Sequence, residues 1–267
     1  MSTSYRIDET ETCGGRTEVL TFGTGERTLV ILPGLSVTPV LAGAETIVSA
    51  YRSFCKDFTV RLVDRRKDPP PGFTLEGMAK DAAAALDALG VTAAHVYGVS
   101  QGGMIAQLLA LERPEFVKKL ALCSTLSREN ETVRAVVTEW IDMAKAGRGE
   151  ELNDAFLQKI LSPKTYRRFG KAILKTLPVP TARELEIFCV NAMAGEGFDI
   201  VSRLPEIRCP SLVLGAENDR VTTAEGARET AAGIGCACKL YPAPYGHAVY
   251  DEAPGIKARV RRFLLKE

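Results

Sequence analysis

Strand-like and helix-like runs alternate along most of this chain, and this alternation limits the folds open to it more than any other feature. The strand-like runs are short, apolar and rich in β-branched residues, whereas the runs between them show helical spacing of apolar residues. Such alternation predicts an α/β fold with a mostly parallel, doubly wound sheet. Strands are expected at about 18–22, 28–32, 58–63, 94–97, 118–123, 210–215 and 237–241, and helices at about 43–56, 75–89, 102–112, 223–234 and 254–265.

The alternation stops in residues 127–205. This segment has helical periodicity without a convincing strand. It is predicted to be a helical cap, inserted into a core formed by residues 1–126 and 206–267. Trp140 and Phe188 are the cap residues predicted to line a substrate pocket. Taken singly, bulky residues of this kind more often only pack a cap onto its core.

The stretch Gly98-Val99-Ser100-Gln101-Gly102 fits the pattern G-x-S-x-G and lies between a strand-like run and a helix-like run. A turn of this kind strains its middle residue and exposes that side chain, while the glycines allow neighbouring chain to approach closely. The start of the helix also favours a developing negative charge. Ser100 is therefore the predicted nucleophile, although the same pattern also occurs by chance in glycine-rich loops.

A serine nucleophile needs a base, and the chain has two histidines, His95 and His247. His95 lies within a predicted strand, where a half-buried structural role is expected. His247 lies in a loop between a strand-like run and a helix-like C-terminal segment. Because loops of this kind can place a side chain over a site, His247 is the predicted base.

The base in turn needs a carboxylate, which holds its tautomer and stabilises the imidazolium that forms. Asp219 follows the predicted strand at 210–215 and is the predicted partner of His247. Glu217 competes for this role. Asp219 could also serve only its own turn, by accepting hydrogen bonds from nearby backbone N–H groups.

An oxyanion hole requires two backbone donors that point at the tetrahedral oxygen. The N–H of Gln101, directly after the nucleophile, is the first predicted donor. The second is predicted at Leu35, in the turn that follows the strand at 28–32, with Ser36 as the alternative. An ordinary turn at the end of a strand would have the same sequence features.

Together these landmarks resemble the α/β-hydrolase family, in particular its single-domain, cap-bearing, esterase-like members. The resemblance covers most of residues 18–126 and 206–267. It departs from the family pattern at Pro33, where a histidine is usual before the oxyanion glycine, and at Lys67, where a glycine is usual. The first departure leaves the donor at Leu35 in place. The matching segments are 32–35, 64–66, 74–78, 98–103, 215–221, 246–247 and 252–254.

The resemblance implies a serine hydrolase that acts on a small, largely apolar carboxylic ester or lactone. Ser100 would attack the carbonyl, His247 would move the proton, and Asp219 would hold His247 in register. The N–H groups of Leu35 and Gln101 would bind the oxyanion. The same residues fit C–C hydrolases, thioesterases and acyltransferases, and a binding protein that keeps the fold is the more distant alternative.

Composition limits the partners and the compartment. The 267 residues carry a formal net charge of +1, which predicts neither a nucleic-acid nor a membrane partner. The sequence begins without a signal-peptide pattern, and its seven cysteines form no C-x-x-C pair. The expectation is a cytoplasmic protein with a small-molecule substrate and without a cofactor or metal, and a homodimer is left open.

Overall fold

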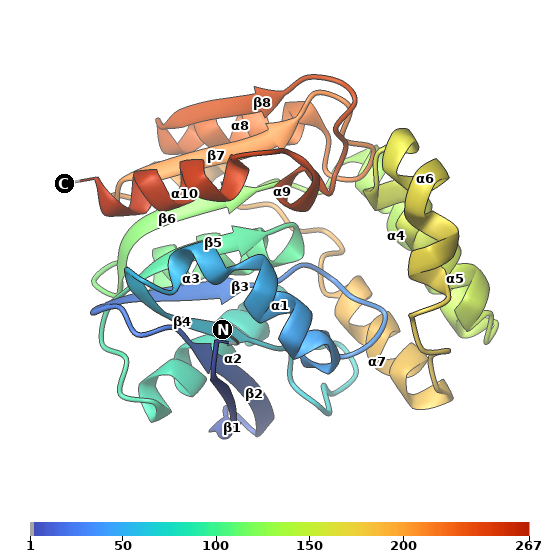
Figure 1. The fold of residues 1–267 in the computed structure, drawn as a ribbon, viewed down its shortest axis with the longest axis horizontal. Coiled ribbons are helices and arrows are strands. Elements are labelled where there is room, and N and C mark those ends of the chain that lie inside the picture. Colours follow the sequence, from blue (N-terminus) through green and yellow to red (C-terminus); the bar gives the residue numbers. More distant parts are fainter. Residues whose placement is uncertain (1–2, 267) are drawn as a thin grey trace.

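The computed structural model describes residues 3–266, and in this part of the chain eight strands form a single sheet (Figure 1). The strand order is β1-β2-β4-β3-β5-β6-β7-β8. From β4 to β8 in this order, all neighbouring strands are parallel, whereas β1 pairs antiparallel with β2 and β2 with β4. The predicted α/β fold with a mostly parallel sheet is confirmed. The strands are β1 (Tyr5–Thr12), β2 (Gly15–Phe22), β3 (Arg27–Leu32), β4 (Phe58–Val63), β5 (Ala94–Val99), β6 (Val117–Cys123), β7 (Ser211–Ala216) and β8 (Ala237–Tyr241).

The strands differ in burial according to their place in the sheet. All six residues of β5, at the centre, are buried, because parallel strands in such sheets are covered by helices on both faces. Strand β1 is absent from the predicted strands because its sequence, YRIDETET, is mostly polar. It lies at the edge of the sheet, where it pairs with β2 over its whole length and exposes most of its side chains. Its hydrogen bonds to β2, rather than an apolar pattern, hold this strand in place.

Helices pack on both faces of the sheet, so the sheet is doubly wound as predicted. Apolar residues of α2, α3 and α8 form one core layer, and those of α1 and α10 form the other. The predicted helix at 43–56 is instead divided at Tyr51 into two short pieces, α1 and η2, because Tyr51 leaves the helical conformation and packs its ring beside Phe54 and Tyr97. The elements are η1 (Val40–Gly43), α1 (Ala44–Ala50), η2 (Arg52–Phe54), α2 (Leu75–Ala88), α3 (Gln101–Glu112), η3 (Val201–Glu206), α8 (Ala224–Ile234), α9 (Val249–Glu252) and α10 (Ile256–Leu265).

The segment between β6 and β7 contains four further helices, which lie together at one end of the sheet (Figure 1). Side chains of Asn130, Ser162 and Thr181 cap the N-termini of α4, α6 and α7. Trp140 and Phe188 are buried in the same apolar cluster as α2 and α3. The division of the chain into a core and a cap stays a prediction. The helices are α4 (Glu131–Lys145), α5 (Gly149–Ile160), α6 (Pro163–Leu174) and α7 (Ala182–Met193).

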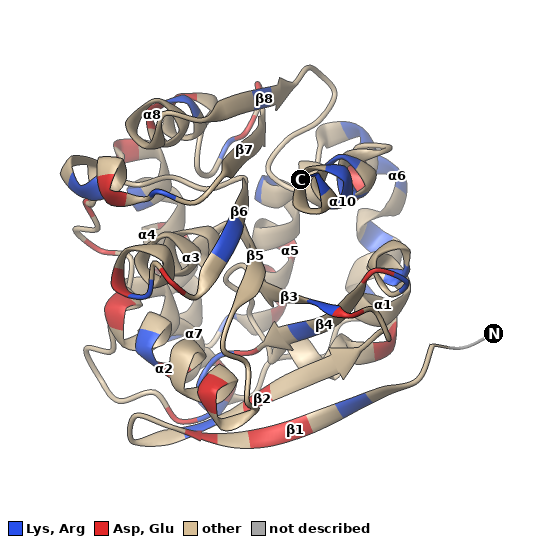
Figure 2. Cartoon of the chain, turned by 90° about the vertical axis from the view of Figure 1, so that its left-hand side faces the viewer, with Lys and Arg blue, Asp and Glu red and all other residues tan. Residues whose placement is uncertain are grey.

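Charged residues of both signs lie on the helices and on β1, whereas the central strands are largely free of them (Figure 2). Arg66, after β4, and Asp81, in α2, are buried charged residues that form an ion pair of 2.6 Å. Both side chains also bind the backbone of Cys13, so the pair fixes the turn between β1 and β2 to α2. Within residues 3–266, no helix is both long enough and apolar enough to span a membrane.

Candidate active site

Ser100 occupies the sharp turn between β5 and α3, with φ of 52° and ψ of −125°. A positive φ is unfavourable for a residue with a Cβ atom, so surrounding contacts must hold this conformation. The N–H of Ser100 donates to the carbonyl of Cys123 at 2.9 Å, and the Thr125 hydroxyl donates to the carbonyl of Ser100 at 2.8 Å. The end of β6 therefore holds the strained turn on both sides of the serine.

The glycines of this turn allow close contact with the neighbouring strand β3. A Cβ atom at Gly102 would lie 2.0 Å from the carbonyl oxygen of Leu32, and one at Gly98 would lie 2.6 Å from the carbonyl oxygen of Gly102. Strands β3 and β5 end at the same level, because Leu32 pairs with Gly98. The turn after β3 consequently reaches Ser100, and a Cβ atom at Gly34 would lie 3.1 Å from that of the serine.

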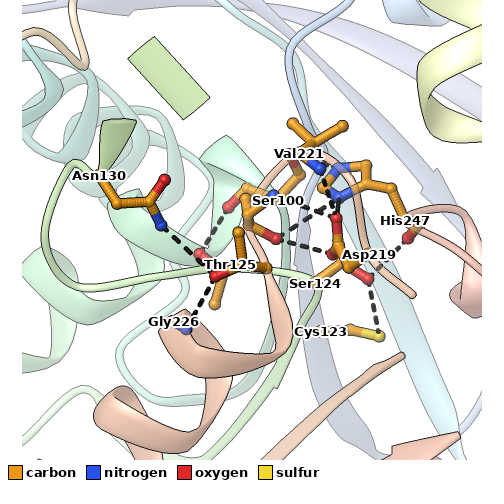
Figure 3. Close-up of polar contacts among 11 residues, drawn as sticks. Ser100, Cys123, Ser124, Thr125, Asn130, Asp219, Val221, Gly226 and His247 are labelled. Carbon is orange, nitrogen blue, oxygen red and sulfur yellow. Dashed lines mark hydrogen bonds and ion pairs between the residues drawn. The ribbon is translucent and has the colours of Figure 1, made fainter. Parts of the chain in front are cut away.

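His247 lies in the loop after β8 and connects Ser100 to Asp219 (Figure 3). Its Nε2 lies 3.0 Å from Ser100 Oγ, and its Nδ1 lies 2.9 Å from Asp219 Oδ2. The ring is almost fully buried, and the hydroxyl of Ser124 donates a hydrogen bond of 2.7 Å to the backbone carbonyl of His247. With a proton on Nδ1 donated to the carboxylate, the free electron pair of Nε2 points at the serine hydroxyl. The structure thus brings the three predicted residues together from the ends of three strands.

Asp219, in the loop after β7, is buried and accepts several hydrogen bonds. The N–H groups of Val221 and Thr222 donate to its Oδ1 at 2.8 and 3.0 Å, and the Thr222 hydroxyl donates to its Oδ2 at 2.9 Å. Burial raises the pKa of Asp219, but the nearby His247 and these hydrogen bonds outweigh it and hold the pKa below its ordinary value. The carboxylate is therefore ionised at neutral pH. Thr222 is absent from the predicted residues, although a threonine three residues after an aspartate in such a turn was a usable signal.

Two residues weighed as alternatives lie elsewhere. Glu217 is exposed, and its carboxylate binds Arg228 at 2.5 Å. His95 lies at the opposite end of β5 from Ser100, where its ring packs edge-on against Phe58. Neither side chain takes part in the contacts of His247 described above.

The two backbone groups predicted to bind an oxyanion flank the serine. Gln101 is the first residue of α3, so its N–H has no acceptor within the helix. The N–H of Leu35 donates no hydrogen bond to any residue in the described range 3–266. Arg65 holds both segments, because its Nη2 donates to the carbonyl of Pro33 at 2.7 Å and to Gln101 Oε1 at 3.3 Å. Gln101 Nε2 in turn donates to the carbonyl of Asn191 in α7 at 2.6 Å.

A cavity of about 280 Å³ opens beside Ser100. Leu35 and Trp140 line it, together with apolar side chains of α3 and α4. The ring of Trp140 is buried and packs on Phe156 at 4.5 Å. Phe188, the second predicted pocket residue, lines a neighbouring cavity of about 220 Å³ instead, and Leu35 lines both cavities. Trp140 is thus placed at the serine, and Phe188 at the adjoining space.

The described residues offer no metal centre, because residues 3–266 contain no group of three or more His, Cys, Asp or Glu side chains suited to a metal ion. The seven cysteine thiols are free in the described chain. Burial raises the pKa of the Cys123 thiol, near Ser100, to about 12, so this group is neutral at physiological pH.

Comparisons with known proteins identify the family of the chain. Residues 61–254 match the family model described as the alpha/beta hydrolase fold. The candidate carbamate hydrolase RutD of Caulobacter vibrioides is 38% identical over 68 residues, which make up 26% of this chain and 25% of RutD. Homoserine O-acetyltransferase of Thermus thermophilus is 27% identical over 219 residues, which make up 69% of this chain and 56% of that enzyme.

A solved structure gives a match over nearly the whole chain. The enol-lactonase of Burkholderia xenovorans superposes with a TM-score of 0.82 and 22% identity, covering 97% of this chain and all of the lactonase. At this level of identity, the likeness shows the fold. The two sequence relatives are matched over only about a quarter and about half of their own lengths.

Proposed function

Because the chain belongs to the alpha/beta hydrolase fold family, we propose that it is a serine hydrolase that cleaves a small, largely apolar carboxylic ester or lactone through an acyl-enzyme intermediate. The observation that carries the proposal is the continuous contact from Ser100 Oγ to His247 Nε2 at 3.0 Å and from His247 Nδ1 to Asp219 Oδ2 at 2.9 Å. A hydroxyl next to an imidazole that a carboxylate orients is the arrangement that turns serine into a nucleophile.

In the acylation step, Ser100 Oγ attacks the carbonyl carbon while His247 Nε2 takes the hydroxyl proton. The N–H groups of Leu35 and Gln101 bind the oxyanion, and the ionised Asp219 stabilises the imidazolium. When the tetrahedral intermediate collapses, the carbon–oxygen bond to the alcohol breaks and His247 gives its proton to the leaving oxygen. The acyl group then remains on Ser100.

Deacylation repeats these steps with water. His247 takes a proton from the water as it attacks the acyl carbon, and the second tetrahedral intermediate uses the same two backbone donors. Collapse of this intermediate breaks the bond to Ser100 Oγ, and the serine regains its proton from His247. The acid product leaves, and in a lactone substrate it carries the alcohol within the same molecule.

The cavity beside Ser100 supports the choice of substrate. Its volume of about 280 Å³ is small, and about half of its lining residues are apolar, among them Leu35, Met104 and Trp140. We propose that residues 127–205 act as the cap that shapes this cavity, since α4 supplies Trp140 and several neighbouring side chains. The shape of this wall would then decide which acyl or alcohol group fits.

Acyl transfer to an acceptor other than water is the second candidate. The 27% identity to a homoserine O-acetyltransferase over 69% of this chain favours it over C–C bond cleavage or thioester hydrolysis. The two activities share the acyl-enzyme and differ in the group that attacks it. Measuring how an ester's acyl group divides between water and added alcohols would separate them.

The proposed function is tested by active-site labelling. A fluorophosphonate probe should modify Ser100, as mapped by mass spectrometry, and His247→Ala should abolish the labelling because the serine then lacks its base. A panel of ester and lactone substrates should show turnover that the probe inhibits. Labelling of a different serine, or lack of hydrolysis across the panel, would overturn the proposal.

A further inference from the structure

A second cavity, of about 220 Å³, adjoins the site, and we call it the Arg65 cavity. Its walls are the turn at residues 35–39, the turn after β4 with Arg65, and the face of α7 with Phe188 and Asn191. Leu35 separates this space from the cavity of Ser100, because it lines both. The mechanism proposed above gives the Arg65 cavity no role.

The guanidinium of Arg65 contacts only neutral acceptors. Its Nη2 donates to the carbonyl of Pro33 and to Gln101 Oε1, its Nε is buried without a partner, and its Nη1 makes no hydrogen bond within residues 3–266. The adjacent Asp64 carboxylate accepts from the N–H groups of Leu41 and Arg65 rather than from the guanidinium. Burial lowers the pKa of Arg65 to about 10, which still leaves the group cationic at neutral pH.

The two basic residues that follow Arg65 do have carboxylate partners. Arg66 binds Asp81 at 2.6 Å, and Lys67 binds Glu9 and Glu18 at 2.6 and 3.0 Å. In the described part of the chain, Arg65 has no carboxylate within ion-pair distance. The neighbouring Asp64 carboxylate raises the pKa of Arg65 but offsets only part of the cost of burial, since the pKa stays below its ordinary value. A buried cation without a directly paired carboxylate is costly, so a site that retains one is suited to receive an anion.

A second unpartnered polar group faces the same cavity from α7. The side chain of Asn191 is 5% exposed, and its Oδ1 is buried without a hydrogen-bond partner. Its amide nitrogen makes no hydrogen bond to any residue in the described chain, while its backbone carbonyl is occupied by Gln101. An amide offers two N–H donors that suit an oxygen ligand. The cavity therefore has a cation on one wall and a free amide on another. Three carboxylates also line it, and each has a partner: Glu18 binds Lys67, Glu184 accepts from the backbone N–H of Thr181, and Asp64 accepts from two backbone N–H groups.

We propose that the Arg65 cavity binds a carboxylate of the substrate, so that the preferred ester or lactone is one that carries a free acid group. Nη1 of Arg65, which makes no hydrogen bond within residues 3–266, can donate charge-assisted hydrogen bonds to a carboxylate, since Nη2 is occupied by Pro33 and Gln101. With the scissile carbonyl at Ser100, the substrate would extend past Leu35 and place its carboxylate between Arg65 and Asn191. This inference rests on the proposed function, because it assigns the substrate class of that same site.

The test compares esters that differ only in charge. Monomethyl adipate is measured against the analogue whose carboxylate is replaced by a primary amide, and the pair is repeated at shorter and longer chain lengths. The wild type should favour the carboxylate in kcat/KM by about 10- to 100-fold at one length, as expected for a charge-assisted hydrogen bond. Equal rates for the two esters at every length would overturn the proposal.

Variants separate binding from structural support. Arg65→Met should remove the preference and Arg65→Lys should keep part of it. Arg113→Met, which removes a cation that is paired with Asp87 and Glu115 and does not line the Arg65 cavity, should leave the preference unchanged. Since Arg65 also holds Pro33 and Gln101, kcat/KM should fall for both the carboxylate ester and the amide ester in Arg65→Met. The ratio of these two kcat/KM values therefore tests the proposal. An unchanged ratio would mean that Arg65 only supports the turn.

Asn191→Asp provides a variant that leaves the contacts of Arg65 intact. It places a negative charge in the cavity and should lower the carboxylate preference about 10-fold or more through like-charge repulsion. An unaltered preference in this variant would contradict the proposed location of the carboxylate.

Binding is measured separately from turnover, by titrating adipate into the Ser100→Ala protein in a calorimeter. One outcome is that adipate binds, that Arg65→Met abolishes this binding, and that the wild type hydrolyses none of the esters. This outcome would support the carboxylate site and overturn the proposed function. Turnover of neutral esters without adipate binding would do the reverse.

Discussion

A histidine lies at each end of β5, and the two imidazoles have opposite surroundings. At the amino end, His95 is buried, its ring lies edge-on to Phe58 with 5.7 Å between ring centres, and its Nδ1 has no hydrogen-bond partner among residues 3–266. At the carboxyl end, Ser100 meets His247, and both ring nitrogens of that histidine have partners. The loops that follow parallel strands converge only at the carboxyl ends, so only there can three distant segments supply a serine, a base and a carboxylate.

Electrostatics separates the two ends further. Burial lowers the pKa of His95 from 6.5 to about 4, and the positive charges of Lys119, Lys118 and Arg27 act in the same direction. His95 is therefore neutral and has no partner to exchange a proton with. At the other end, an ionised carboxylate faces the imidazole at 2.9 Å and can stabilise a positive charge on it.

Removal of the nucleophile is the most direct test that the chemistry lies at the carboxyl end of β5. Ser100→Ala should lower kcat for ester hydrolysis by about 10⁴- to 10⁶-fold, the scale expected when a triad serine is lost. Ser211→Ala, at the start of β7, provides the matched control and should stay within a few fold. Steady-state kinetics on the best ester of the panel checks both. Activity in Ser100→Ala above a tenth of the wild type would refute the assignment.

Replacement of the Asp219 carboxylate should give the next largest fall in kcat. Asp219→Asn should reduce kcat by about 10⁴-fold, because the amide no longer holds His247 in the productive tautomer. Glu217→Gln removes a carboxylate from the same loop but only breaks the exposed pair with Arg228, so kcat should change by no more than a few fold. The reverse ranking of these two variants would move the acid to Glu217.

Much of this site was predictable because its residues follow local patterns at strand ends. The strained turn at Ser100 is encoded by glycines on both sides, and Asp219 and His247 each follow a strand of the same parallel sheet. A parallel sheet brings such loops to one edge, so a sequence that reveals its strands also reveals which loops meet. Their distances, and the choice between Asp219 and Glu217, required the structure.

The features that sequence reasoning missed depend on contacts between distant segments. Strand β1 is polar and is held by pairing with β2, and the helix predicted at 43–56 breaks because the ring of Tyr51 packs in the core. Arg65 and Asn191 are far apart in sequence and meet only through Gln101. A cation without a carboxylate partner cannot be recognised from a sequence that shows three consecutive basic residues.

The cavity wall should set selectivity rather than rate. Trp140→Leu enlarges the space beside Ser100 and should shift the preferred acyl or alcohol length by about 10- to 100-fold in relative kcat/KM, since an apolar pocket discriminates weakly. Phe188→Leu, in the adjoining cavity, should leave the ranking of neutral esters unchanged. A chain-length series of neutral esters measures both variants. Identical rankings in Trp140→Leu and wild type would show that α4 only covers the site.

The smallest effect is expected at the amino end of β5, and it concerns stability. Because the pKa of His95 is depressed in the folded protein, the unfolded state binds more protons between pH 6.5 and about 4, so stability falls as pH drops through this window. His95→Phe should abolish this loss, which is about 3 kcal/mol. Urea unfolding of both proteins at neutral pH and near the lower end of the window measures the difference.

The same variant also tests whether the two ends of β5 are functionally separate. At neutral pH, His95→Phe should keep kcat within a few fold of the wild type, because His95 lies at the opposite end of the strand from Ser100 and an apolar ring can replace a histidine whose Nδ1 has no partner. A large fall in kcat, with unfolding unchanged, would mean that the amino end of β5 takes part in the chemistry. An acid-induced loss of stability equal in both proteins would instead assign that loss to other groups.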